Sequence, residues 1–230
     1  MLPQKREHKL YSSILCLAIW LGCLLSANAQ QTSPSNTDWQ FWPELDVSIK
    51  LSQRVSVLAM GTLHFGKNVS DLNEEQSGFG FNFTLNKYFS LSPDYRYGSG
   101  QPPGRSHTRE HRFFLDFTAR APLKHGFGLS DRSRIELRRI NGVESHRYRN
   151  KLQLERSFSI HDHKLTPYLS DEVFYDDRFH IWNRNRIYAG VRVPLNQHLT
   201  LDPYFLEQFD VRDRPFERRH VIAINLRIDY

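Results

Sequence analysis

The sequence predicts an all-β fold, a closed antiparallel up-and-down transmembrane β-barrel of roughly 10 to 12 strands. Three observations lead to this prediction. Apolar and polar residues alternate along most of the chain. Many of the alternating segments are about ten residues or longer, and short connections alternate with longer polar ones. Together these features are typical of barrels whose outer face meets lipid and whose inner face is polar.

Residues 1–29 are predicted to be a cleaved signal peptide and are set aside from the fold. Three basic residues precede residue 10, an apolar run extends from Ile14 to Leu25, and Ala27-Asn28-Ala29 supplies small residues for cleavage. The apolar run is too short for a permanent transmembrane helix, which needs about 20 residues. We therefore expect cleavage after Ala29 and export from the cytoplasm.

The composition of the remaining chain excludes several kinds of site. Both cysteines, Cys16 and Cys23, lie in the predicted signal, so disulfides, thiolate metal sites and cysteine nucleophiles are excluded from the mature chain. Beyond residue 29 there are 28 basic and 24 acidic residues. This excess is small and evenly spread, which argues against nucleic acid as a partner. No cofactor and no metal is predicted.

The alternation is clearest in the closing segment, from His220 to Tyr230. Every second residue from Ile222 onward is apolar, and the residues between include Asn225, Arg227 and Asp229. Eleven segments are predicted as strands: 44–51, 54–65, 77–87, 89–97, 109–121, 127–140, 146–156, 165–175, 181–194, 199–209 and 218–230.

The number of strands presents a conflict. Residues 44–230 form the predicted barrel and residues 30–43 an N-terminal segment. Single-chain bacterial barrels have an even number of strands. The even number requires either a twelfth strand at Trp39-Gln40-Phe41-Trp42 or one false strand among the eleven. In both cases we expect closure, because an open edge in lipid would leave backbone groups unpaired.

Charged residues share one face of each predicted strand, and that face is expected to point into the lumen. An arginine at the bilayer midplane costs about 2 to 4 kcal/mol, so lipid would not tolerate this face. The predicted site is a lumen network of arginine and glutamate pairs. Its members are Glu110, Arg112, Arg132, Arg134, Glu136, Arg138, Arg147, Arg149, Glu155, Glu172, Arg184 and Arg186.

Turn positions predict which of these residues pair. A two-residue turn at Asn141-Gly142 places Glu136 opposite Arg147 and Arg134 opposite Arg149. In the next hairpin, a short loop near 176–180 places Glu172 close to Arg184 and Ser170 near Arg186. A carboxylate between guanidinium groups offsets part of the cost of enclosing either charge.

The lumen network permits two interpretations, and both stay open. The network is either a structural, salt-bridged filling of a narrow barrel or the lining of a narrow pore for anionic solutes. A different class of function, an outer-membrane lipase or lipid A-modifying enzyme, would use His111 beside Glu110 with Ser106 and His107. Ser106 is not flanked by the glycines of a nucleophile elbow, so the chain is predicted not to be an enzyme. A soluble periplasmic ligand-binding β-barrel is a further alternative, although its exposed apolar faces would aggregate in water.

Several short motifs resemble one bacterial family in their order and spacing. They are Trp42-Pro43-Glu44, Glu110-His111-Arg112, Arg134-Ile135-Glu136-Leu137-Arg138, Arg147-Tyr148-Arg149, Pro167-Tyr168 with Glu172, and Arg184-Asn185-Arg186 with Tyr188-Ala189-Gly190. From Trp39 to Tyr230 the chain resembles the domain of unknown function 2490 family. The resemblance implies an outer-membrane-type barrel and carries over no functional residue.

The expected location is the cell outer membrane, with outer-membrane lipid as the first partner. The barrel-assembly machinery is the second, and we expect it to recognise the C-terminal strand that ends at Tyr230. The barrel is expected to be a monomer.

Overall fold

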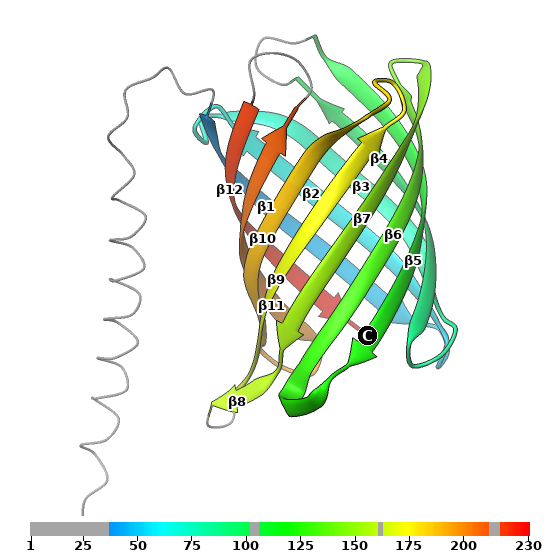
Figure 1. Cartoon of the computed structure of the whole chain (residues 1–230), viewed down its shortest axis with the longest axis vertical. Coiled ribbons are helices and arrows are strands. Elements are labelled where there is room, and N and C mark those ends of the chain that lie inside the picture. Colours follow the sequence, from blue (N-terminus) through cyan, green and yellow to red (C-terminus); the bar gives the residue numbers. More distant parts are fainter. Residues whose placement is uncertain (1–36, 102–105, 161–162, 212–216) are drawn as a thin grey trace, which may run out of the picture. The chain divides into compact units, whose positions relative to one another are not determined.

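The structure, a computed structural model, describes residues 37–101, 106–160, 163–211 and 217–230 (Figure 1). Apart from one 3-10 turn, η1 (Lys124–Gly126), the elements in these ranges are strands. They are β1 (Thr37–Lys50), β2 (Val55–Gly66), β3 (Asp71–Thr84), β4 (Phe89–Gly100), β5 (Thr108–Pro122), β6 (Phe127–Ile140), β7 (Val143–Arg156), β8 (Phe158–Ile160), β9 (His163–Asp176), β10 (Ile181–Pro194), β11 (Leu199–Asp210) and β12 (Glu217–Asp229). No helix in the described ranges is long and apolar enough to cross a membrane. The predicted signal peptide lies outside the described residues.

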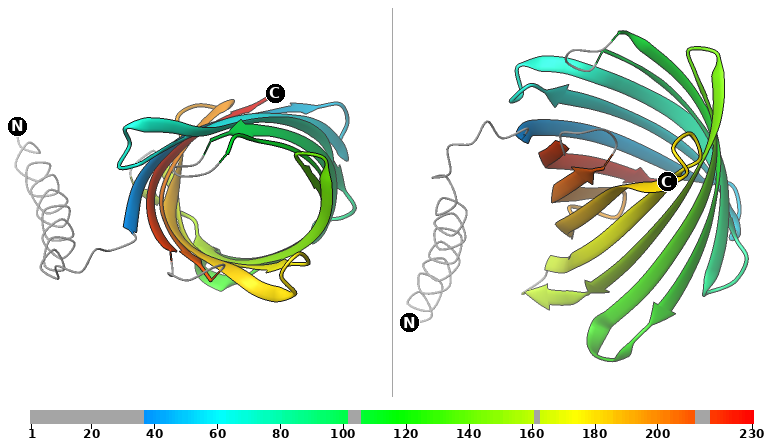
Figure 2. Two further views of the ribbon diagram at one scale, coloured as in Figure 1. Left: turned by 90° about the horizontal axis from the view of Figure 1, so that it is seen from above. Right: turned by 45° about the horizontal axis from the view of Figure 1, so that its top comes forward.

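The strands form one closed barrel. From β1 to β7 each strand lies antiparallel to its neighbour in sequence, β7 then pairs with β9, and β9 to β12 continue in order. The three-residue β8 pairs with β9 and does not contribute to the wall. The ring closes where β1 lies parallel to β12, from Thr37 opposite Arg218 to Ser48 opposite Asp229. The wall therefore has eleven strands. The left view of Figure 2 looks down into this ring.

The closed barrel and the eleven segments are confirmed, but the expectation of an even strand number was wrong. A parallel closing pair lets an odd number of strands close without a free edge, so the backbone is paired all round. At the end of this seam, Tyr230 N donates to Ser48 O at 2.8 Å. The segment Trp39 to Trp42 is not a twelfth strand, because it continues through Pro43 as the first half of β1.

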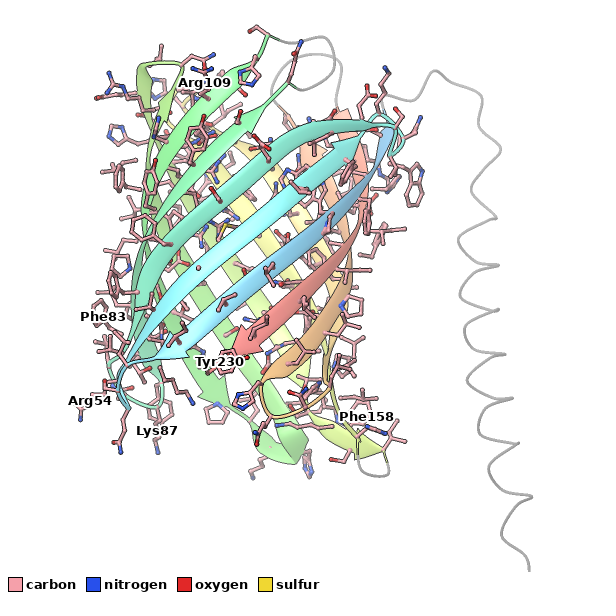
Figure 3. The ribbon with its side chains drawn as sticks, turned by 180° about the vertical axis from the view of Figure 1, so that it is seen from behind. Arg54, Phe83, Lys87, Arg109, Phe158 and Tyr230 are labelled. Atoms are coloured by element: carbon pink, nitrogen blue, oxygen red, sulfur yellow. The ribbon has the colours of Figure 1, made fainter. Side chains whose placement is uncertain are left out.

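The connections lie at two ends of the barrel. The C-terminal end carries the turns that follow β1, β3, β5, β7 and β10, together with Tyr230. The opposite end, named here the loop end, carries the other connections. In Figure 3, Arg54 and Lys87 lie at the C-terminal end and Arg109 lies at the loop end. The predicted strand ranges 54–65 and 77–87 left a long connection between them, and this length was wrong. In the structure β3 begins at Asp71, and the connection is a four-residue turn with positive φ at Lys67, Asn68 and Val69.

The outer face of the barrel is largely apolar. Phe79, Leu115 and Ile222 point outward near the middle of their strands and are 59%, 42% and 52% exposed. Charged residues at alternate positions in the same strands point inward, as Arg112 and Asp116 do on either side of Phe114. The predicted separation of the two faces is therefore present in the structure.

A short sequence repeat has a common structural position. Pro93, Pro167 and Pro203 are each the fifth residue of a strand, in β4, β9 and β11, and these strands all run from the C-terminal end to the loop end. The residue after each proline points inward. Tyr168 donates to Asp202 at 2.9 Å, and Tyr204 donates to Glu44 at 2.8 Å. The repeat therefore places polar side chains at equivalent positions in the lumen.

Gly190 of β10 allows these tyrosines to pack. A Cβ atom at this position would lie 2.6 Å from the Tyr168 ring and 2.7 Å from Tyr204 Cβ. We expect Gly190→Ala to lower the free energy of unfolding by about 1 to 3 kcal/mol through overpacking. Gly61→Ala is the matched control, since the nearest atom to its Cβ would be 4.0 Å away. Equal denaturant midpoints for the two variants would contradict this packing.

Candidate functional site in the barrel lumen

All twelve residues of the predicted site face the lumen, because each occupies an inward position in the strand alternation. The structure brings them together in separate groups. The largest is named here the central network and includes one acid that the sequence did not indicate. It consists of Asp116, Arg132, Arg134, Glu136, Arg147, Arg149 and Glu172.

Two fully buried glutamates hold the centre of this network. Glu136 accepts from Arg147 Nε at 2.5 Å and from Arg149 at 3.0 Å. Glu172 accepts from Arg149 at 2.7 Å and from Arg132 at 2.6 Å. Arg149 thus links the two carboxylates across β6, β7 and β9. The pairings of Glu136 with Arg147 and of Arg134 with Arg149 in the strand register confirm the two-residue turn at 141–142.

Asp116 of β5 attaches a further arginine to the central network. Arg134 Nε and a terminal nitrogen donate to its two carboxylate oxygens at 2.5 and 2.7 Å, the paired geometry that guanidinium and carboxylate favour. The Arg134 guanidinium also lies 3.8 Å from the centre of the Phe114 ring. An inward phenylalanine interrupts the polar alternation at this position, and stacking with a cation gives it a partner in the charged lumen.

A second group lies nearer the loop end. Glu110 accepts from Arg112 at 2.9 Å and from Arg138 at 2.6 Å, and Arg138 also reaches Asp176 at 3.2 Å. In the turn between β9 and β10, Arg178 donates to Asp176 at 2.7 and 2.9 Å. These hydrogen bonds raise the pKa of the Arg178 guanidinium, so it stays charged.

The remaining predicted residues lie outside these two groups. Arg184 donates to Asp210 at 2.5 Å, and Arg186 donates to the amide oxygen of Gln208 at 2.7 Å. Glu155 pairs with Arg192 near the C-terminal end.

The predicted neighbours of Arg184 and Arg186 were wrong by one inward position. Glu172 lies opposite Arg186 in the register, and Arg184 lies opposite Phe174. The hairpin begins with Ile181 opposite Asp176, one residue later than predicted, and a bulge between Trp182 and Arg184 adds one more residue to β10.

Sequence reasoning missed several partners of the arginines: Asp116, Asp176, Tyr188, Gln208 and Asp210. Asp116 shares its strand face with Arg112, and this spacing could have identified it. Asp176 and Asp210 are the last residues of β9 and β11. They could not be distinguished from loop residues by alternation alone.

The lipase alternative loses its proposed acid. Glu110 faces the lumen, whereas His111 is on the outer face and contacts Tyr95 OH at 2.8 Å. The two side chains are on opposite sides of the wall and do not form a base and its orienting acid. His107 lies 3.2 Å from Ser99 Oγ. Within the described ranges, no group of three or more His, Cys, Asp or Glu side chains could hold a metal ion.

The comparison with known families shows which family the chain belongs to. Residues 39–218 match the family described as "Protein of unknown function (DUF2490)". The chain belongs to the DUF2490 family. The resemblance predicted from the short motifs is thereby confirmed. No curated protein matches the DUF2490 chain significantly.

Solved structures give a likeness in fold. LpxR from Salmonella typhimurium is similar to the DUF2490 barrel with a TM-score of 0.50 and 8% identity, over 76% of this chain and 83% of that one. The β domain of the Bordetella autotransporter BrkA has a TM-score of 0.48 and 13% identity, over 74% and 82%. At such identities the likeness concerns the fold alone.

Proposed function

We propose that this DUF2490 chain is an integral outer-membrane β-barrel whose lumen is closed by its own ion-pair network. In this proposal the inside of the barrel is structural and does not conduct solutes. Function then belongs to the outer surface and the loop end. The apolar outer face supports the membrane location, because so much exposed apolar surface would aggregate in water.

The burial of the inward side chains supports a closed lumen. Each of the eleven wall strands has at least one buried side chain, and Glu136, Glu172, Leu206 and Gln208 have no exposed surface. The lining of a water-filled pore would be exposed to solvent. Inward side chains that cover one another support a filled lumen.

The charge balance also favours a structural role over an anion pore. Arg112 and Arg138 share Glu110, and Arg149 contacts both Glu136 and Glu172. A pathway for anions needs cations that are free to bind them. In the central network, each arginine lies within ion-pair distance of a carboxylate.

Planar-bilayer recordings test the closed lumen. We expect the wild-type chain to add no steady unit conductance, since the network occludes the lumen. A double variant, Arg149→Ala with Glu172→Ala, removes two inward side chains from the neighbouring strands β7 and β9. Because the two residues form an ion pair with each other, removing both leaves neither one without its partner. It should conduct, whereas a Glu155→Ala, Arg192→Ala control near the C-terminal end should stay silent. Regular single-channel steps from the wild-type chain would refute the proposal.

Membrane fractionation and gel mobility test the location. Folded outer-membrane barrels resist detergent, so we expect the chain in the outer-membrane fraction and a change in gel mobility after boiling. Recovery as a soluble periplasmic protein would favour the ligand-binding alternative. As part of the same proposal, the barrel-assembly machinery recognises β12 through its outward apolar residues and Tyr230, which is 65% exposed.

A further inference from the structure

One wall of the barrel carries a group of hydrogen-bonding side chains on its outer face, near the middle of its strands. Asp131 and Ser133 of β6, Asn150 of β7, Asp171 of β9 and Asn185 of β10 all occupy outward positions near the middle of the wall. They are named here the outer polar patch. Their inward neighbours are the arginines and glutamates of the lumen, so the alternation fixes their direction.

The patch is contiguous across four neighbouring strands. Asn150 lies directly opposite Ser133, and Leu152 lies opposite Asp131 on one side and Asp171 on the other. Asn150 Nδ2 donates to Asp131 at 2.9 Å and to Ser133 Oγ at 3.3 Å. Asn185 Nδ2 donates to Asp171 at 2.5 Å. These bonds hold the polar groups together, and Leu152 is 48% exposed between the two acids.

Lipid alone is a poor cover for this patch. Ionisable side chains inside a membrane are rare, and they usually face protein or water. Among the described residues, no cation lies within ion-pair distance of Asp131 or Asp171. The opposite wall presents Leu45 of β1 on its outer face, with Gly61 and Leu226 on either side. The patch therefore distinguishes one side of the barrel from the other.

The patch has hydrogen-bond donors and acceptors that are not used within it. The second oxygen of each aspartate has no partner in the described residues, which gives two carboxylate acceptors. Asn185 retains one N–H, and the Ser133 and Tyr148 hydroxyls, 3.1 Å apart, retain one O–H between them. Whatever covers the patch must therefore offer both donors and acceptors.

We propose that the outer polar patch is the interface with a second copy of this chain. This inference rests on the proposed membrane location, and it replaces the expectation of a monomer. A second barrel inserted in the same membrane presents the same donors and acceptors at the same depth. Polar side chains that meet across such an interface stabilise association in lipid, and two-fold pairs are the commonest oligomers. The neighbouring Trp182, which packs edge to face against both Tyr148 and Tyr175, extends the interface.

Cysteine cross-linking in intact outer membranes tests the proposal. The only cysteines, Cys16 and Cys23, lie in the predicted signal, so the parent chain sets the background. Leu152→Cys places a thiol within the patch and leaves its polar groups intact. Leu45→Cys, 43% exposed on the opposite wall, is the matched control. With a short bis-maleimide, we expect a band of twice the monomer mass for Leu152→Cys and none for Leu45→Cys.

A second variant shows whether the polar groups cause the association. Adding Asp171→Leu and Asn185→Leu to Leu152→Cys should reduce the cross-linked fraction about tenfold. Both changes are on the outer face, and the mobility shift after boiling shows whether the barrel still folds. No dimer band from Leu152→Cys, equal bands from both walls, or a band with a different protein would overturn the proposal. If the chain is absent from the membrane fraction, the proposed function is wrong. If the chain is in the membrane but Leu152→Cys gives no dimer band, only the proposed interface is wrong.

Discussion

Glu172→Gln is expected to lower the free energy of unfolding by about 3 to 5 kcal/mol, the usual cost of removing one partner from a buried ion pair. Glu172 has no exposed surface and accepts hydrogen bonds from Arg132, Arg149 and Tyr188. Glutamine keeps the shape of the side chain but removes its charge. Arg132 then retains only Asp116, at 3.8 Å, as a carboxylate partner. Guanidinium titrations of the barrel in lipid vesicles, followed by tryptophan fluorescence, measure the loss.

Glu155→Gln is the matched control for this change. Glu155 also faces the lumen and pairs with Arg192, but the two side chains are 29% and 26% exposed. Ion pairs that water can reach contribute about 0 to 1 kcal/mol. We therefore expect little change in the denaturant midpoint. A loss as small for Glu172→Gln as for Glu155→Gln would mean that the central network does not stabilise the barrel.

Leu115→Arg is expected to cost about 2 to 4 kcal/mol, because it places a charge on the lipid-facing side of β5 at mid-wall. Leu115 lies between Pro93 of β4 and Ile135 of β6 on the outer face. Val143→Arg is the control, since Val143 begins β7 at the loop end and is 66% exposed. An arginine near the membrane surface costs about 0 to 1 kcal/mol. If Leu115→Arg and Val143→Arg unfolded at the same denaturant concentration in vesicles, position 115 would face water and not lipid.

The fold could be predicted from the sequence because one physical contrast recurs in nearly every strand. Lipid outside and charged groups inside impose a period of two, as between Phe113 and Arg112 or between Ile135 and Arg134. The number of strands could not be predicted from this alternation. Alternation is the same in parallel and antiparallel pairs, so it did not reveal that β1 and β12 run in the same direction.

The pairing within the lumen could be predicted only where the turn was regular. The tight turn at Asn141-Gly142, where both residues have positive φ, fixed the register of β6 and β7. The four-residue turn 177–180 and the bulge after Trp182 have no clear sequence signal, and each shifts the pairing by one residue. Together they moved Glu172 from Arg184 to Arg186. The outer polar patch was missed for another reason. Asp131, Asn150 and Asp171 are separated in sequence, and only the strand order makes them neighbours.

Oxygen accessibility along β12 tests the central claim most directly, that one wall separates lipid from a closed polar lumen. Nitroxide spin labels are placed singly at cysteines introduced from Val221 to Leu226, in the barrel reconstituted in vesicles. Oxygen concentrates in lipid, so labels at the outward positions 222, 224 and 226 should collide with it most. Labels at 221, 223 and 225 should be protected, since the native side chains there face the lumen. Uniform accessibility, or maxima at the odd positions, would contradict the account.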